Sequence, residues 1–345
     1  MTNSTQENNV VDTLKTDFDL SVTYAYGEPT EHLDFRRAPE DFIVHELSEM
    51  EFTGEGEHFW LKIQKTGENT QWVADKLAQF FAIAASDVGY AGMKDRHAVT
   101  TQWFSLYLPG KTHTIDWDAF IASTEVNAIL LESHTHAQKL RRGQHDGNRF
   151  SLRLHGVTDQ ADLEARLTKI STHGVPNYFG EQRFGRDGNN LQMAINSFVD
   201  QRPIRNKHKK GLAMSAARSY LFNLVLSHRV AQGNWYELIE GDQHDRVPTG
   251  PLWGRGRPLC SDATLVLESL ALHEYLAWCN QLEHCGLNQD RRSLVLMPEN
   301  MSWEFDGDSL VITLDLAGGE FATSVLRELA VLNNCAHVNR PPAVN

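Results

Sequence analysis

The stretch AGMKDRHAVTTQWFSL, residues 91–106, joins a polar loop to an apolar segment and sets the fold predicted for the first half of the chain. A solvated turn usually has fewer bulky neighbours than KDRH (residues 94–97) has here. We therefore expect two buried strands joined by a turn. The turn places one carboxylate, Asp95, among three potential cations, which is typical of a site that needs one ionised acid.

The flanking segments alternate between strand and helix patterns. Residues 57–65 alternate apolar and polar side chains, which predicts a half-buried strand. Residues 70–86 carry apolar side chains at helical spacing and predict a helix with Thr70 as its N-cap. A second alternating segment, 148–157, precedes a short helical pattern at 162–171. Residues 30–172 therefore predict an α+β unit.

The later part of the chain is more helical until strand patterns return near its end. Ser215 and Gly233 bound a predicted helix as N-cap and stop, and a second helical pattern covers 265–283. Strand patterns at 291–298 and 309–319 then precede a final helix at 319–332. Strands that bracket a helical middle predict an inserted domain. We expect a flexible polar tail at residues 1–20 and a sheet domain in two parts, 21–173 and 295–345. Residues 174–294 are expected to form a mostly helical α/β domain inserted between these parts.

Composition excludes several classes of protein. The chain has 345 residues, 41% of them apolar, and no apolar run long enough to cross a bilayer. Residues 1–20 lack the apolar segment of a secretory signal, and the four cysteines form no C-x-x-C pair, so we expect a cytoplasmic protein with reduced thiols. The histidines are scattered without a zinc motif, and we predict no metal and no cofactor. Nothing resembles a coiled-coil seam, and we expect a monomer.

The formal net charge of −13 argues, by itself, against a polyanionic partner. Local basic clusters modify this view. Each cluster, judged singly, is more often a solvated surface segment than a phosphate site. Together with the motifs below, two of the clusters make Arg141, Arg142, Lys207 and Lys209 candidates for phosphate contacts.

Other features support a role for Asp95, although an isolated K-D-R is more often a turn. Asn148 and Phe150 stand at the start of a predicted strand, where alternation puts both on one face. Arg36 precedes a further acidic strand pattern at 38–46. A carboxylate, an amide, an aromatic ring and a cation together suit a flipped nucleobase held over an ionised acid.

Seven motifs occur in an order that resembles the TruD family of tRNA pseudouridine synthases, from about residue 30 to about residue 338. They are PEDF (39–42), AGMKDRHAVTTQ (91–102), KLRRGQHDGNRF (139–150), GVPNYFGEQRFG (174–185), SAARSYLFN (215–223), PTGPLWG (248–254) and FATSVLREL (321–329). The segment after PTGPLWG is shorter than in family members, and the tail before Ser21 has no counterpart there.

The resemblance implies the fold of a pseudouridine synthase catalytic domain, with a mixed or antiparallel sheet, and an enzyme that isomerises uridine 13 in the D-arm of tRNA. It implies Asp95 as the catalytic residue. Asn148 and Phe150 fall on the family's substrate-binding positions, with Phe150 taking the place of a stacking tyrosine. Arg36 matches a position that is commonly Lys.

The chemistry leaves two routes open. Asp95 attacks the anomeric carbon to give a sugar ester, or removes the C2′ proton to give a glycal. Both need an ionised carboxylate, which a nearby cation favours. Because successive strand residues point oppositely, Lys94 and Arg96 cannot both flank Asp95, and we expect Arg36 to be its partner. Lys94 is expected to contact substrate phosphate or an acid such as Glu40.

Two other functions remain open at this point. One is a catalytically silent RNA-binding protein of the same fold. The other is a glycosidase-type hydrolase, which usually needs paired carboxylates. Glu40 and Asp41 are adjacent acids, but we expect them to face apart in a strand.

Overall fold

The computed structural model describes residues 14–110, 115–243 and 246–337. The chain divides into two compact units. The sheet unit consists of residues 29–172 and those from 297 onward, and the helical unit of residues up to 28 and 173–296.

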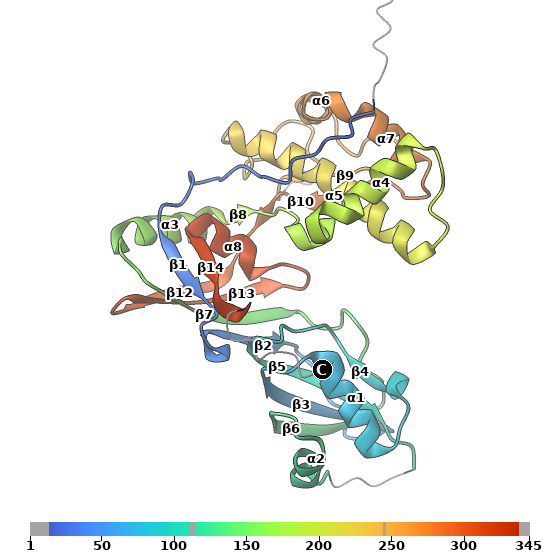
Figure 1. The fold of residues 1–345 in the computed structure, drawn as a ribbon, viewed down its shortest axis with the longest axis vertical. Coiled ribbons are helices and arrows are strands. Elements are labelled where there is room, and N and C mark those ends of the chain that lie inside the picture. Colours follow the sequence, from blue (N-terminus) through green and yellow to red (C-terminus); the bar gives the residue numbers. More distant parts are fainter. Residues whose placement is uncertain (1–13, 111–114, 244–245, 338–345) are drawn as a thin grey trace, which may run out of the picture. The chain divides into compact units, whose positions relative to one another are not determined.

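The sheet unit is built on a ten-stranded mixed sheet (Figure 1). Most neighbours are antiparallel, but β2 (Phe42–Leu47) runs parallel to β5 (Val99–Tyr107), and β1 (His32–Phe35) runs parallel to β14 (Val331–Asn334). The main path has the order β12-β13-β7-β2-β5-β3-β6. The remaining strands of that path are β3 (His58–Thr66), β6 (Ala128–His136), β7 (Gly147–His155), β12 (Glu299–Asp306) and β13 (Ser309–Ala317).

Helix α1 (Thr70–Phe81) packs on β3, β5 and the short strand β4 (Val88–Tyr90) (Figure 1). Its inward face includes the fully buried Val73 and Leu77, each worth about 1.5–3 kcal/mol of burial. Helix α2 (Trp117–Thr124) joins the same core through Phe120. The predicted N-cap is wrong by one residue, since Asn69 Oδ1 accepts from the Gln71 backbone N–H at 2.8 Å. Thr70 is thereby free for another contact, described below.

Two further helices belong to the sheet unit. Helix α3 (Gln160–His173) follows β7, and α8 (Ala322–Leu329) follows β13. Arg166 joins them by donating from Nη1 to the Glu328 backbone oxygen at 3.1 Å. Strands and helices that share one unit confirm the predicted α+β class with a mixed sheet.

The predicted strand before the turn is shorter than expected. Strand β4 ends at Tyr90, and residues 91–98 form a loop before β5 begins at Val99. Strand alternation therefore does not apply to residues 94–96. The acidic segment before β2 is also not a strand at its start, because Pro39–Asp41 form a 3₁₀ turn.

The helical unit contains four α-helices in its described residues: α4 (Asn189–Val199), α5 (Lys207–Ala231), α6 (Asp262–Ala271) and α7 (Leu276–Glu283). Two short strand pairs accompany them, β8 (Val175–Pro176) with β11 (Val295–Leu296) and β9 (Thr249–Leu252) with β10 (Asp290–Ser293). Helix α5 begins two turns before the predicted N-cap Ser215, because Asn206 caps it by accepting from Lys209 N. The helix predicted over 265–283 is two helices, separated by a 3₁₀ turn at His273–Tyr275.

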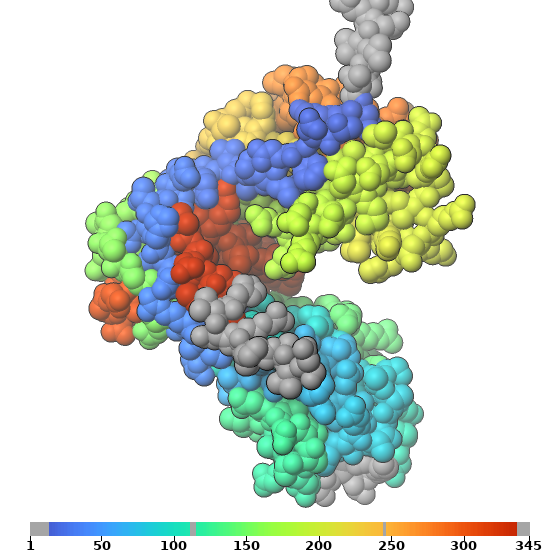
Figure 2. Space-filling view, viewed as in Figure 1, coloured from blue at the N-terminus to red at the C-terminus, as the bar shows by residue number. Residues whose placement is uncertain are grey.

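The N-terminal segment from residue 14 to residue 28 packs on the helical unit, where it appears in blue in Figure 2. Leu14, Phe18 and Leu20 contact the helical core, and the Trp278 indole donates to the Lys15 backbone oxygen at 2.9 Å. Tyr26 donates its hydroxyl to the Gly174 oxygen at 2.6 Å. Residues 14–20 are thus not the expected flexible tail, because their apolar side chains are used in packing. Residues 1–13 of that tail lie outside the described residues.

The same packing assigns residues 21–28 to the helical unit, which corrects the predicted sheet-domain boundary at residue 21. Among the described residues, no helix has the length and apolar character needed to span a membrane.

Candidate active site around Asp95

Asp95 lies in the loop of residues 91–98, hereafter the Asp95 loop, and forms an ion pair with Arg36. Arg36 Nη2 donates to Asp95 Oδ2 at 3.1 Å, with side-chain exposures of 14% for Arg36 and 52% for Asp95. Asp95 is therefore held from the protein side while its other face is open to solvent. Arg36 was the expected partner of Asp95, and the structure places it there. The expectation assumed that residues 94–96 form a strand, whereas they lie in a loop.

Arg36 reaches Asp95 from the connection after β1. Its backbone φ of 60° lies in the left-handed region, which is uncommon for a residue other than glycine. The guanidinium carbon lies 4.1 Å from the Phe42 ring centroid and 4.7 Å from that of Phe35. Burial lowers the pKa of Arg36, and the Asp95 charge opposes this change. Stacking on two rings fixes the direction of the cation, while the adjacent Arg37 turns away to Asp34 at 2.7 Å.

Lys94 points in the opposite direction to Asp95, into the protein. Its ammonium lies 3.3 Å from Glu46 Oε2 and donates to Asn148 Oδ1, and the Lys94 and Glu46 side chains are 5% and 1% exposed. Burial lowers the pKa of Lys94, and Glu46 opposes this change. A buried ammonium does not fit the expected phosphate contact. Its acid partner is Glu46 rather than the expected Glu40.

Strand register explains why Glu46 and Asn148 meet beneath the loop. They are direct partners across β2 and β7, and Val44 opposes Phe150 two residues further on. Partners in an antiparallel pair point to the same face, so Asn148 and Phe150 share the face that carries Lys94. The sequence predicted this shared face from alternation alone.

The Asp95 loop is also held through its backbone. Thr70 Oγ1 accepts from the Lys94 backbone N–H at 3.0 Å and donates to Gln102 Oε1 at 2.9 Å. Gln102 Nε2 then donates to the Gly92 backbone oxygen at 3.1 Å. Helix α1 and strand β5 thereby fix the loop at Lys94 and at Gly92, two residues before it. The order of Lys94 inward and Asp95 outward follows from these contacts.

Phe150 lies in the floor of the site. Its side chain is 7% exposed, and its ring packs edge-on against Phe42 with centroids 6.0 Å apart. A continuous aromatic contact thus joins Phe150 through Phe42 to the guanidinium of Arg36. Little ring surface is open in this conformation, so a base that stacks on Phe150 must approach it along the remaining exposed part.

The glycine before Asn148 is required by a close backbone approach. A Cβ on Gly147 would lie 2.3 Å from the Leu316 oxygen of β13. Any other residue would push β7 and β13 apart and displace Asn148.

Comparison with known proteins identifies the family. The family model "tRNA pseudouridine synthase D (TruD)" matches residues 21–202. The tRNA pseudouridine synthase D of Cellvibrio japonicus is 46% identical over 326 residues, which cover 93% of this chain and 96% of that protein. The protein of the same name from Aeromonas salmonicida is 42% identical over 342 residues, with coverages of 92% and 96%. The chain belongs to the TruD family of tRNA pseudouridine synthases.

A solved structure supports the fold of this TruD-family chain. The crystal structure named for tRNA pseudouridine synthase D of Methanosarcina mazei superposes with a TM-score of 0.67. It covers 90% of this chain and 96% of its own, at 18% sequence identity. The fold is therefore retained where most of the sequence differs.

The residues expected to contact phosphate divide between the two units of the TruD-family chain. Arg141 and Arg142 are exposed in the sheet unit, and Arg142 Nη2 donates to the Tyr90 hydroxyl at 2.9 Å. Tyr90 in turn donates to Gln71 Oε1 at 2.5 Å, which connects Arg142 to the first turn of α1. Lys207 and Lys209 are exposed in the first turn of α5, in the helical unit.

A hollow of about 590 Å³ lies elsewhere, in the helical unit, where residues 15–23 pass over α5. Tyr220, Tyr275 and Ser227 contribute to its lining, and none of the predicted site residues does. We assign the site from the ion pairs around Asp95 instead, because that is where charged groups converge. In the described part of the chain, no three or more His, Cys, Asp or Glu side chains are grouped to hold a metal ion.

Sequence reasoning missed four polar residues around the Asp95 loop. Three of them, Glu46, Thr70 and Gln102, hold the loop directly, and the fourth, Lys65, is fully buried in β3. For two of them, Glu46 and Lys65, the sequence pattern contained a usable signal. Glu46 follows Phe42 and Val44 in the inward register of β2, and Lys65 follows Leu61 and Ile63 in β3. A charged residue in an apolar register is a candidate for a site.

Proposed function

We propose that this chain converts uridine 13 in the D-arm of tRNA to pseudouridine, with Asp95 as the catalytic residue. The observation that carries this proposal is the arrangement at Asp95: one solvent-facing carboxylate held by Arg36, above the buried side chains of Lys94 and Glu46 and the half-buried Asn148. Membership of the TruD family supports the reaction class.

The reaction is an isomerisation in which the uracil leaves through N1 and returns through C5. The N1–C1′ bond breaks, the C5–C1′ bond forms, and the proton lost from C5 is balanced by one gained at N1. Asp95 acts on the ribose, either as a nucleophile at C1′ or as a base at C2′. A substrate with deuterium at C2′ distinguishes the routes, because only proton removal from C2′ is slowed by the heavier isotope.

The other site residues support this chemistry. Arg36 keeps Asp95 ionised when a nucleotide excludes water, since an adjacent cation favours the charged form of a carboxylate. Phe150 provides an aromatic surface for the free uracil, worth about 1–3 kcal/mol, which is sequence-tolerant and lets the ring turn. Asn148 is oriented by Lys94 to hydrogen-bond the base or the ribose. Lys94 binds substrate through Asn148 rather than through phosphate.

Basic side chains supply the affinity for RNA. We infer that Arg141, Arg142, Lys207 and Lys209 contact phosphates, so binding weakens steeply as salt rises. The affinity for a tRNA transcript, measured between 50 and 200 mM salt, tests this inference. A protein that makes 6–10 phosphate contacts loses about 10³–10⁵-fold in affinity over that range. A flat response contradicts it. We place the protein in the cytoplasm, where its free thiols would remain reduced.

One assay separates the candidate functions. An unmodified tRNA transcript is incubated with the protein, and pseudouridine is mapped by carbodiimide adducts and primer extension. We expect a single new stop directly on the 3′ side of position 13, which disappears when uridine 13 is replaced by cytidine. Intact uridine indicates the silent RNA-binding protein, and an abasic site indicates the glycosidase. A stop elsewhere in the tRNA retains the enzyme class but contradicts the position.

A further inference from the structure

Lys65 is a buried cation close to the site with no carboxylate at ion-pair distance among the described residues. It lies near the end of β3, opposite Thr100 of β5, and is 0% exposed. Its ammonium donates to the Glu68 backbone oxygen at 2.7 Å. A buried lysine without an ion-pair partner is costly to fold, so a purpose at this position is expected.

The segment that Lys65 holds is the 67–69 connection between β3 and α1, and this connection contacts the Asp95 loop directly. Arg96 Nε donates to the Gly67 oxygen at 3.2 Å, and the Gly67 N–H donates to the Ala98 oxygen at 3.1 Å. These two bonds fix the residues that follow Asp95. Lys65 thus connects the strand to the side of the loop that Thr70 and Gln102 do not hold.

The charges around Lys65 point to the same relation. Asp95 is the strongest opposite charge acting on Lys65, ahead of Glu68 on the 67–69 connection, whereas Lys94 acts in the opposite sense. Burial lowers the pKa of Lys65 to about 8 despite these carboxylates. On the neighbouring strands β5 and β6, the residues paired with Lys65 are Thr100 and Ala128, which carry no charge. The ammonium is therefore mostly protonated at neutral pH.

We propose that Lys65 is a positioning residue for Asp95: it holds the 67–69 connection against the Asp95 loop and supplies, from the protein interior, a second positive charge that keeps Asp95 ionised when a nucleotide covers the site. This inference rests on the proposed function of Asp95. Arg36 stabilises the charged form of the carboxylate from one side when water is excluded. Lys65 does so from the interior, where screening by solvent is weak.

The electrostatic part of the proposal is testable without RNA. Lysine-selective ¹⁵N and ¹³C NMR follows the titration of Lys65, which we expect near pH 8. Because coupling between two sites is reciprocal, Asp95→Asn removes a favourable charge and lowers the titration midpoint of Lys65. The control is Asp118→Asn, an exposed change in the first turn of α2 that should leave the midpoint in place. An unchanged midpoint in Asp95→Asn overturns the proposal.

The functional part uses two variants of Lys65. Lys65→Gln keeps a hydrogen-bond donor for the Glu68 oxygen but removes the charge, and Lys65→Met removes both. We expect the acidic limb of kcat/KM against pH to move to higher pH in both, with an additional loss of kcat in Lys65→Met. The control is Lys62→Gln, three residues earlier on the same strand, where a partly exposed lysine pairs with Glu132.

If Lys65→Gln retains the parent pH profile, the charge has no role and the proposal is overturned, whatever Lys65→Met does. Melting temperatures of both variants, measured beside the profile, show whether a loss of rate is only a loss of folded protein. If the parent protein forms no pseudouridine at all, the proposed function fails by itself. The NMR titration of Lys65 then still decides whether it is coupled to Asp95.

Discussion

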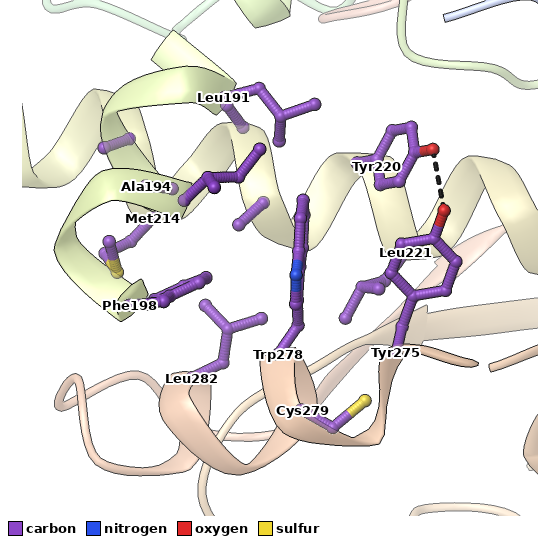
Figure 3. Close-up of a cluster of buried hydrophobic side chains, with 14 of the residues drawn as sticks. Leu191, Ala194, Phe198, Met214, Tyr220, Leu221, Tyr275, Trp278, Cys279 and Leu282 are labelled. Atoms are coloured by element: carbon purple, nitrogen blue, oxygen red, sulfur yellow. Dashed lines mark hydrogen bonds between the residues drawn. The ribbon is translucent and has the colours of Figure 1, made fainter. Parts of the chain in front are cut away.

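Two buried clusters in this protein, one in each unit, contain polar atoms for opposite reasons. Beneath Asp95, an ammonium, a carboxylate and an amide meet on the face of a sheet, at Lys94, Glu46 and Asn148. In the helical unit, Tyr220, Tyr275 and Trp278 pack together, with the two tyrosine hydroxyls 3.0 Å apart (Figure 3). The first cluster contains charges and little apolar surface, and the second contains aromatic rings and no charge.

The difference separates function from stability. Buried charges are often no better for stability than apolar residues of the same size, so a charged cluster in a sheet indicates selection for something else. Buried rings contribute transfer energy and packing, and their polar tips need only a partner. We therefore expect changes around Asp95 to alter the reaction, and changes around Trp278 to alter stability.

The largest effect is expected at the reacting group. Asp95→Asn keeps the shape of the side chain but removes the charge that we propose acts on the ribose, and single-turnover rates should fall about 10⁴-fold, as they do on removal of other catalytic aspartates. Binding of tRNA, measured by filter retention, should stay close to that of the parent. Asp118→Asn serves as the control. An undiminished rate in Asp95→Asn contradicts the assignment of Asp95.

The largest effect on stability is expected in the other cluster. Trp278 is fully buried among Phe198, Tyr220 and Tyr275, and its indole donates to the Lys15 oxygen. Trp278→Ala should lower the free energy of unfolding of the helical unit by about 3–5 kcal/mol, through lost burial and a cavity. Urea denaturation measures this. The titration midpoint of Lys65, in the sheet unit, should not move, and a shift there would mean that the clusters are not separate.

The buried cation Lys65 should make the free energy of unfolding depend on pH. The pKa of Lys65 is about 8 in the folded protein against 10.5 for the free group, so the unfolded chain binds more protons between these values. Stability conferred through this group therefore rises with pH from about 8 to 10.5, by up to about 3 kcal/mol. Lys65→Met should lack this rise. The difference in unfolding free energy between parent and variant, followed by urea titration across that window, should grow in favour of the parent, and a constant difference refutes it.

The cation that pairs directly with Asp95, Arg36, is expected to matter less. Arg36→Ala removes one charge-assisted hydrogen bond, and kcat/KM should fall about 10- to 100-fold, with the acidic limb of the pH profile moved to higher pH. Arg37→Ala is a matched control, because that side chain pairs with Asp34 instead. Unchanged turnover and an unchanged pH profile in Arg36→Ala would remove Arg36 from the proposed site.

The two clusters also differ in how far sequence could predict them. Alternation put Asn148 and Phe150 on one face, and the family resemblance pointed to Asp95 and Arg36. The partner of Lys94 was missed, because the position of β2 between β5 and β7 is a long-range property of the sheet that no local pattern encodes. Thr70 was assigned as a cap because Asn69, beside it, has the same preference, and only the three-dimensional structure separates their roles. The prediction of Ser215 as an N-cap was wrong for a related reason. The first two turns of α5 are charged and contain a glycine, so they lack an apolar helical pattern.

The smallest effect tests whether the polar tips in the aromatic cluster matter at all. The Tyr275 hydroxyl lies in a cluster where burial raises its pKa, and its partner Tyr220 also accepts from the Asp19 backbone N–H at 3.3 Å. Tyr275→Phe therefore leaves Tyr220 with one partner and should cost only about 1 kcal/mol of unfolding free energy, with no change in the rate of uridine isomerisation. Tyr236→Phe, at a tyrosine that is 38% exposed, is the control and should cost less. A loss of rate in Tyr275→Phe without loss of stability would mean that the aromatic cluster contributes to the reaction, and that the division between the two clusters is wrong.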